Sequence, residues 1–148
     1  MIIAFLLGMR TTEYSIQDTR LNPDDLYILP LQLFMEMVRY RYFKGSSFIL
    51  FLNKTDLFEE KVNSGVHIGD YIKGYGGPNY DVVKGREFFR SLFISARQDV
   101  YSEAGQCTPT TPFFVHFTCS TDTNQIRNIF DSIKATVMIQ NVNEMALS

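Results

Sequence analysis

One polar turn in the sequence could recognise a purine base. A short apolar run, Ser47–Leu52, is followed directly by Asn53, Lys54, Thr55 and Asp56. The carboxylate of Asp56 can accept hydrogen bonds from two adjacent donors, and charge-assisted bidentate bonds of this kind are strong and selective. Guanine presents two such donors, its N1–H and its exocyclic amine, whereas adenine has no matching pair. Guanine recognition is therefore one hypothesis for this turn.

The neighbouring residues suit the same chemistry. Asn53 can brace an adjacent loop, and the aliphatic stem of Lys54 can lie over a base while its ammonium reaches solvent or ribose. A second polar turn, Thr118-Cys119-Ser120-Thr121, follows a further apolar run, and a backbone N–H such as that of Ser120 could donate to guanine O6. The four-residue pattern alone also fits a polar helix start with Asp56 as its cap.

The elements that position these turns follow from hydrophobic patterning. Short apolar runs over 2–7, 47–52 and 113–117 predict buried strands. The cluster Asn22-Pro23-Asp24-Asp25 predicts a helix start, and Pro30 is expected to kink or restart that helix. A second helix is expected over 81–98, and five of the nine glycines lie in 65–80, which is expected to be a loop.

The last helix is expected from about Thr123. Its apolar residues fall on one stripe: Ile126, Ile129, Phe130, Ile133 and Val137. Strands alternating with helices predict an α/β fold with a parallel sheet and right-handed crossovers. Ligands of such sheets bind at the carboxyl ends of the strands, which is where the turns 53–56 and 118–121 stand.

Composition excludes several other classes of protein. A net charge of −2 and a pI near 5.6 give no electrostatic reason to bind nucleic acid. Cys107 and Cys119 have no metal-binding or redox spacing, and His67 and His116 have no second ligand at metal spacing. The apolar start is too short to span a bilayer, and Ile2 stands where N-myristoylation needs glycine.

Two long stretches carry a resemblance to a known family. FILFLNKTDLFEEKV and VHFTCSTDTNQIRNIFDSI resemble heterotrimeric G-protein α subunits nearly residue for residue, and looser similarity covers the rest of the chain. The resemblance implies a guanine site for GTP or GDP. Its expected base-binding residues are Asn53, Lys54, Thr55, Asp56, Leu57, Cys119, Ser120 and Thr121.

The resemblance also implies a partial architecture. We expect residues 1–148 to form the C-terminal half of a Ras-like GTPase domain, a partial three-layer fold like that of P-loop NTPases. Three parallel strands, crossover helices and a long C-terminal helix would compose it. The sequence contains neither GxxxxGK[ST] nor Asp-x-x-Gly, and the family's arginine finger has no counterpart. We therefore expect the phosphate-binding loop, the switch regions, the helical domain and the Mg²⁺ ligands to be absent. Hydrolysis by this chain alone is not expected, and the first strand should be an aggregation-prone edge.

The family's partners define the remaining expectations. A G-protein-coupled receptor would contact Val142 and Leu147 near the C-terminus, with Gβγ and effectors as further partners at the inner face of the plasma membrane. Either a receptor-binding competitor that cannot cycle or a non-functional fragment remains an alternative. Tyr40, Tyr42 and Phe43 could form a partner surface, although core packing is favoured.

Overall fold

A computed structural model describes residues 2–8, 25–105, 111–119 and 123–146, and three parallel strands form its centre. The strands are β1 (Ile2–Gly8), β2 (Ser47–Asn53) and β3 (Phe113–Phe117). The main helices are α1 (Asp25–Arg39), α2 (Thr55–Asn63), α4 (Val82–Glu103) and α5 (Thr123–Ala146). Two short helical turns complete the described elements, a 3₁₀ turn η1 (Arg41–Phe43) and α3 (Ile68–Tyr71).

The strand order is β1-β2-β3, so β2 is central. Ile2 pairs with Ser47 and Gly8 with Asn53, while Phe48 pairs with Phe113. All six apolar or small residues of 47–52 are buried, as a strand covered on both faces requires. The α/β expectation is therefore confirmed in its general form.

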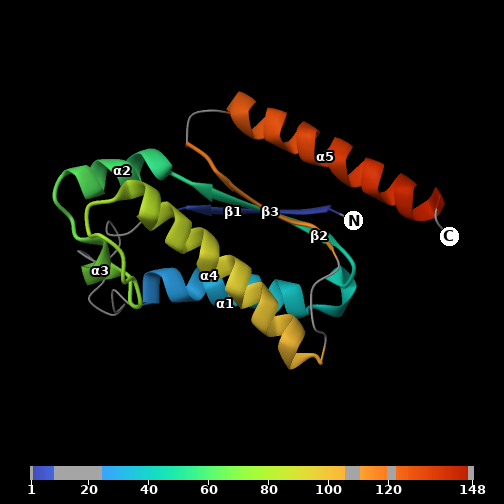
Figure 1. Cartoon of the computed structure of the whole chain (residues 1–148), viewed down its shortest axis with the longest axis horizontal. Coiled ribbons are helices and arrows are strands. Elements are labelled where there is room, and N and C mark those ends of the chain that lie inside the picture. Colours follow the sequence, from blue (N-terminus) through green and yellow to red (C-terminus); the bar gives the residue numbers. More distant parts are fainter. Residues whose placement is uncertain (1, 9–24, 106–110, 120–122, 147–148) are drawn as a thin grey trace.

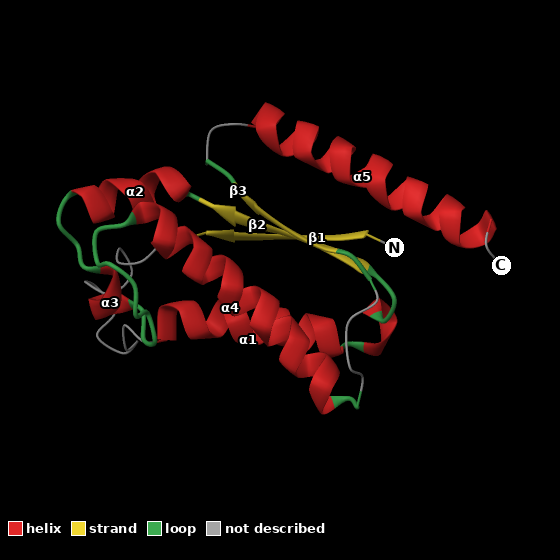
Figure 2. Cartoon of the chain, in the orientation of Figure 1, coloured by secondary structure: helices red, strands yellow, loops and turns green. Residues whose placement is uncertain are grey.

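The helices cover the two faces of the sheet separately (Figure 1). On one face, Phe34 of α1 and Phe93 of α4 pack with Phe48 and Leu50 of β2. On the other face, Ile133 and Val137 of α5 pack with Ile49 and Phe51. Alternate residues of β2 thus serve two cores, which fixes its register against both helical layers. The secondary-structure view shows α5 running along its own side of the sheet (Figure 2).

Three helical expectations differ from the structure. Of the kink or restart expected at Pro30, the restart does not occur: α1 is one continuous helix, because one lost hydrogen bond is outweighed by the burial of Phe34 and Val38 beyond it. Helix α4 extends five residues beyond the predicted end at Gln98, and Val100 continues its buried stripe. The expected loop 65–80 contains α3, whose Ile68 is buried.

Core packing was also predicted wrongly at a few aromatic positions. Tyr40 and Tyr42 are 54% and 63% exposed, whereas Phe43 does pack against the core. Tyr40 directly follows α1 and Tyr42 lies in η1, so both stand after the part of α1 that packs on the sheet. Phe130 of α5 is 37% exposed, because Ile133 and Val137 take the positions that face the sheet.

Gly85 explains how closely α4 approaches α2. A Cβ at this position would lie 2.7 Å from Phe58 Cζ and 2.8 Å from Ile68 Cδ1. Gly85 is therefore required by packing. Helix α4 begins with Asp81 as its N-cap, whose carboxylate accepts from the Lys84 N–H at 2.9 Å.

Candidate functional site

The turns after β2 and β3 are joined by hydrogen bonds. The Thr118 N–H donates to Leu52 O at 2.9 Å, which extends the parallel ladder by one residue. Thr55 then donates twice to Thr118 O, from its N–H at 3.2 Å and from its Oγ1 at 3.0 Å. We call these contacts between residues 53–55 and Thr118 the clasp. The clasp brings the two predicted recognition turns together at the carboxyl edge of the sheet.

Asn53 is held by the same clasp. The Thr118 hydroxyl donates to Asn53 Oδ1 at 3.2 Å, and Thr118 is only 1% exposed. Fixing the amide oxygen also fixes the direction of the amide N–H₂, which is left to donate on the other side of the group. Asn53 therefore braces the second turn, as the sequence suggested.

Lys54 has a backbone conformation that is rare for a residue with a side chain. Its φ of 62° and ψ of 36° place it in the left-handed region, and it is the one non-glycine residue with positive φ in the described ranges. Such a conformation costs roughly 1–2 kcal/mol for an L-residue, and strain of this kind concentrates at functional sites. It produces the abrupt turn by which the chain leaves β2 and enters α2.

Asp56 lies in the first turn of α2 and is exposed. The N-cap is Lys54, which makes no side-chain cap, so the alternative reading of Asp56 as the helix cap is wrong. Among the residues that the structure describes, the Asp56 carboxylate makes no hydrogen bond or ion pair. It lies near the α2 N-terminus, whose dipole favours a negative charge, and Leu57 beside it is half-buried.

Arg86 supports this turn from behind, and the sequence reasoning missed it. Its Nη2 donates to Thr55 O at 3.3 Å and to Glu59 Oε2 at 3.0 Å, which ties α4 to the start of α2. Arg90, one turn later, donates from Nη2 to Val115 O at 3.0 Å. In the sequence, both arginines read as ordinary polar residues of a predicted helix. Their role becomes visible only from the contacts that α4 makes with distant parts of the chain.

The second turn is described only in part. Thr118 and Cys119 follow β3, with Thr118 buried and Cys119 half-buried, whereas Ser120 and Thr121 lie outside the described residues. His116 precedes them on the α5 side of the sheet, beside Phe51. Burial, and then the nearby Arg90 guanidinium, lower the pKa of His116 below its ordinary value.

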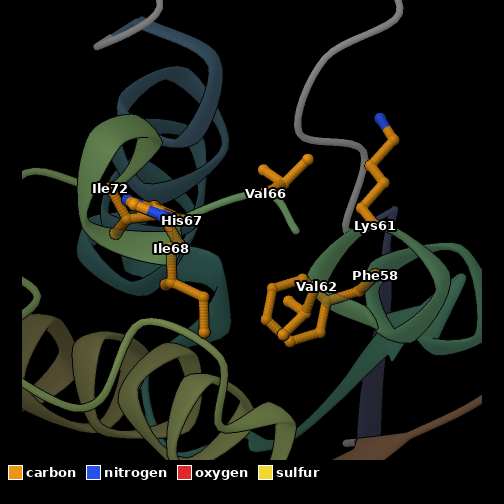
Figure 3. A pocket seen from close by; sticks show the side chains of 7 residues that line it. All are labelled: Phe58, Lys61, Val62, Val66, His67, Ile68 and Ile72. Carbon is orange, nitrogen blue, oxygen red and sulfur yellow. The ribbon is translucent and has the colours of Figure 1, made fainter. Parts of the chain in front are cut away.

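A small pocket behind α2 is too small for a ligand (Figure 3). Its volume is about 10 Å³, which is near the minimum for one water molecule. Phe58, Val62 and Ile68 form its inner wall, and they belong to the core that holds α2 in place. In the described part of the chain, no three His, Cys, Asp or Glu residues gather as a metal site would require.

Of the two predicted receptor contacts, the structure describes only Val142. Val142 is 64% exposed on α5, and Leu147 lies outside the described residues. None of the helices in the described ranges is long and apolar enough to cross a membrane.

A comparison with known protein families gives a match over most of the chain. The family described as G-protein alpha subunit matches residues 27–137, three quarters of the chain. The matched range includes both turns of the clasp, so the family resemblance seen in the sequence is confirmed. Val142 and Leu147 lie beyond the matched range.

Proposed function

The chain belongs to the G-protein alpha subunit family, and we propose that it recognises guanine through the two turns joined by the clasp. The observation that carries the proposal is the pair of hydrogen bonds from Thr55 to Thr118 O at 3.2 and 3.0 Å. They link two segments that are 63 residues apart at the edge where parallel sheets bind ligands.

Each proposed contact follows from the chemistry of the group. Asp56, exposed and uncommitted within the described ranges, accepts from guanine N1–H and the exocyclic amine. The Lys54 stem covers one face of the base, and Leu57 flanks it. The amide of Asn53, already fixed by Thr118, holds the second turn, in which Cys119, Ser120 and Thr121 present a backbone N–H to O6.

We further propose that this chain handles only the base part of GTP or GDP. Its residues suit guanine, but the sequence carries no GxxxxGK[ST] loop and no Asp-x-x-Gly turn, which hold phosphate and Mg²⁺ in the family. Residues 1–148 then correspond to the C-terminal half of a Ras-like, P-loop-type GTPase domain. The purified 148-residue chain should bind guanine nucleotides weakly and should not hydrolyse GTP.

Base specificity tests the proposal directly. Xanthine carries a carbonyl oxygen in place of the guanine amine, so it needs a donor where Asp56 offers an acceptor. The wild-type chain should prefer GDP to XDP and ADP in equilibrium titrations, and Asp56→Asn should shift that preference toward XDP by about tenfold or more.

Glu60→Gln is the matched control, because Glu60 is an exposed acid on the same helix, one turn further along. This variant should keep the preference for GDP. An unchanged base preference in Asp56→Asn would contradict the assignment of Asp56. Measurable GTP turnover by the purified chain, lost in Asp56→Asn, would overturn the expectation of no hydrolysis.

A receptor-facing role is proposed for α5. Val142, 64% exposed on that helix, has an apolar side chain that does not pack in either core of the described residues. Together with Leu147 it would contact a G-protein-coupled receptor at the inner face of the plasma membrane, where Gβγ and effectors are the family's other partners. A chain that engages the receptor without cycling would act as a competitor.

Competition with an intact family member tests this role. Added chain should slow receptor-stimulated nucleotide exchange on the intact α subunit, and Val142→Lys should remove the inhibition. Val83→Lys is a suitable control, since Val83 is 66% exposed on α4. If the Val142 and Val83 variants inhibited equally, the receptor contact at Val142 would be wrong.

A further inference from the structure

A second pocket lies at the opposite edge of the sheet from the clasp. Its volume is about 250 Å³, and it opens between the C-terminal ends of α1 and α4, beside η1. The ends of α1 and α4 come just before β2 and β3 in the chain, whereas the clasp comes just after these two strands. The length of the strands therefore separates the two sites (Figure 1). This pocket is independent of the proposed guanine site.

The inner wall of the pocket is apolar. Val38 and Val100, 7% and 6% exposed, come from facing positions on α1 and α4. Ala104 and the ring of Tyr101 continue this wall. Tyr101 is also fixed from behind, because the Arg97 guanidinium carbon lies 5.4 Å from the centre of its ring.

The rim of the pocket is cationic. Arg39, Arg41 and Lys44 line it, and none of the described residues that line it is acidic. Arg39 is already paired, through Nη2 with Glu103 at 2.7 Å and through Nη1 with Glu36 at 3.2 Å. The two remaining cations are therefore the ones that can serve a ligand.

Arg41 and Lys44 have no carboxylate partner among the described residues. Arg41 donates to the Tyr42 hydroxyl at 2.9 Å, and its guanidinium lies 4.8 Å from the centre of that ring. Basic residues in the last turn of a helix often complement its dipole, which explains Arg39. Arg41 and Lys44 lie beyond the end of α1, so this effect does not explain them.

We propose that this pocket binds a small phosphate monoester, with the phosphate between Arg41 and Lys44 and the organic group against Val38 and Val100. A monoester carries about −1.5 to −2 charges at neutral pH, which matches two uncompensated cations. A guanidinium also binds phosphate through two parallel hydrogen bonds. The volume is below the range of roughly 300–1,000 Å³ for drug-sized ligands, so the organic group is small.

The same phosphate chemistry has two sources, a soluble monoester and the headgroup of a lipid such as phosphatidic acid. For the soluble source, phenyl phosphate is titrated into the full chain and binding is followed by calorimetry. Phenol and inorganic phosphate serve as the neutral and the purely anionic comparisons. Phenyl phosphate should bind more tightly than either, because only it engages both the rim and the apolar wall.

For the lipid source, sedimentation with phosphatidylcholine vesicles is measured with and without phosphatidic acid. Arg41→Gln/Lys44→Gln should weaken binding of the preferred form by about tenfold or more. Both residues are exposed, so the variant should fold. Lys84→Gln, an exposed lysine at the other end of α4, should bind like the wild type. Asp56→Asn should also bind normally, which separates this pocket from the guanine site.

Binding of phenyl phosphate alone would assign a soluble ligand, and binding of acidic vesicles alone would assign a lipid; both support the pocket. The proposal fails if neither binds. It fails equally if the double variant binds like the wild type, or if phenol binds as tightly as phenyl phosphate.

Discussion

Lys54 combines a strained backbone with a proposed role in binding. Its φ of 62° is a conformation that glycine adopts freely, so Lys54→Gly should leave the free energy of unfolding within about 1 kcal/mol of the wild type. The same change removes the side chain proposed to cover the base. Chemical denaturation and GDP titration should therefore give different results, with stability retained and affinity reduced. A parallel loss of both would mean that Lys54 serves the fold.

Thr118 is the residue on which the clasp depends. Thr118→Val keeps the shape of the side chain and the backbone bonds to Leu52 and Thr55, but it removes the donor to Asn53 Oδ1. We expect a loss of about 1–3 kcal/mol in the free energy of unfolding, measured with urea, because a polar group is left without its partner. Ser102→Ala, which removes an exposed hydroxyl on α4, should change stability little. Equal effects of the two changes would show that the Asn53 contact is unimportant.

The sequence indicated which residues could bind a ligand, but not which residues hold them in place. Asp56 and Asn53 could be selected because a carboxylate matches the two adjacent donors of guanine and an amide can brace a neighbouring loop. Arg86 could not be selected, and the hydrogen bond from Thr118 to Asn53 could not be foreseen, since the partners lie 31 and 65 residues away in the chain. The base-binding roles themselves stay predictions.

Gly85 lowers the helix propensity of α4 but allows α4 to pack closely against Phe58 and Ile68. Gly85→Ala improves helix propensity by about 1 kcal/mol. The added methyl would, however, meet Phe58 and Ile68 at 2.7 and 2.8 Å. Overpacking of this kind costs roughly 1–3 kcal/mol, so we expect net destabilisation in a thermal or urea melt. Gly76→Ala, where a Cβ has open space, is the control and should be nearly neutral.

The types of the strands and long helices were predictable, but the ends of the helices and the short helix α3 were not. The buried strands and the periodic stripe of α5 follow from hydrophobic patterning, and the structure has them. Helix α1 continues through Pro30 because the core on its far side holds Phe34. Helix α3 forms around Ile68, which local rules place in a glycine-rich loop but which is buried in the core with Phe58 and Val62.

The stability of the whole molecule should depend on pH through His116. Its Nε2 is buried without a hydrogen bond in the described part of the chain, and burial followed by Arg90 lowers its pKa from 6.5. Just below pH 6.5 the unfolded chain binds a proton that the folded chain still excludes. Above about pH 6.5 His116 is neutral in both states and does not lower the free energy of unfolding. As pH falls from there toward the folded pKa, protonation of the unfolded chain lowers that free energy.

Urea denaturation at pH 7.5 and 5.5 measures this dependence. The wild type should lose stability at the lower pH, and His116→Gln should reduce the loss, because glutamine does not titrate. Ser102→Ala, which removes an exposed hydroxyl that does not titrate in this range, should retain it. An identical loss in wild type and His116→Gln would show that other groups determine the acid sensitivity.

The clasp also has a consequence for the order of folding. It joins residues 55 and 118, and β3 can pair with β2 only after the intervening chain has been brought round. The entropy of closing such a loop must be overcome before the contact contributes any energy, and parallel sheets of this kind form slowly. Helix α4, whose backbone hydrogen bonds each join residues four apart, can form before the clasp closes. The two turns should therefore acquire hydrogen-exchange protection late in refolding, so that the recognition edge is completed last.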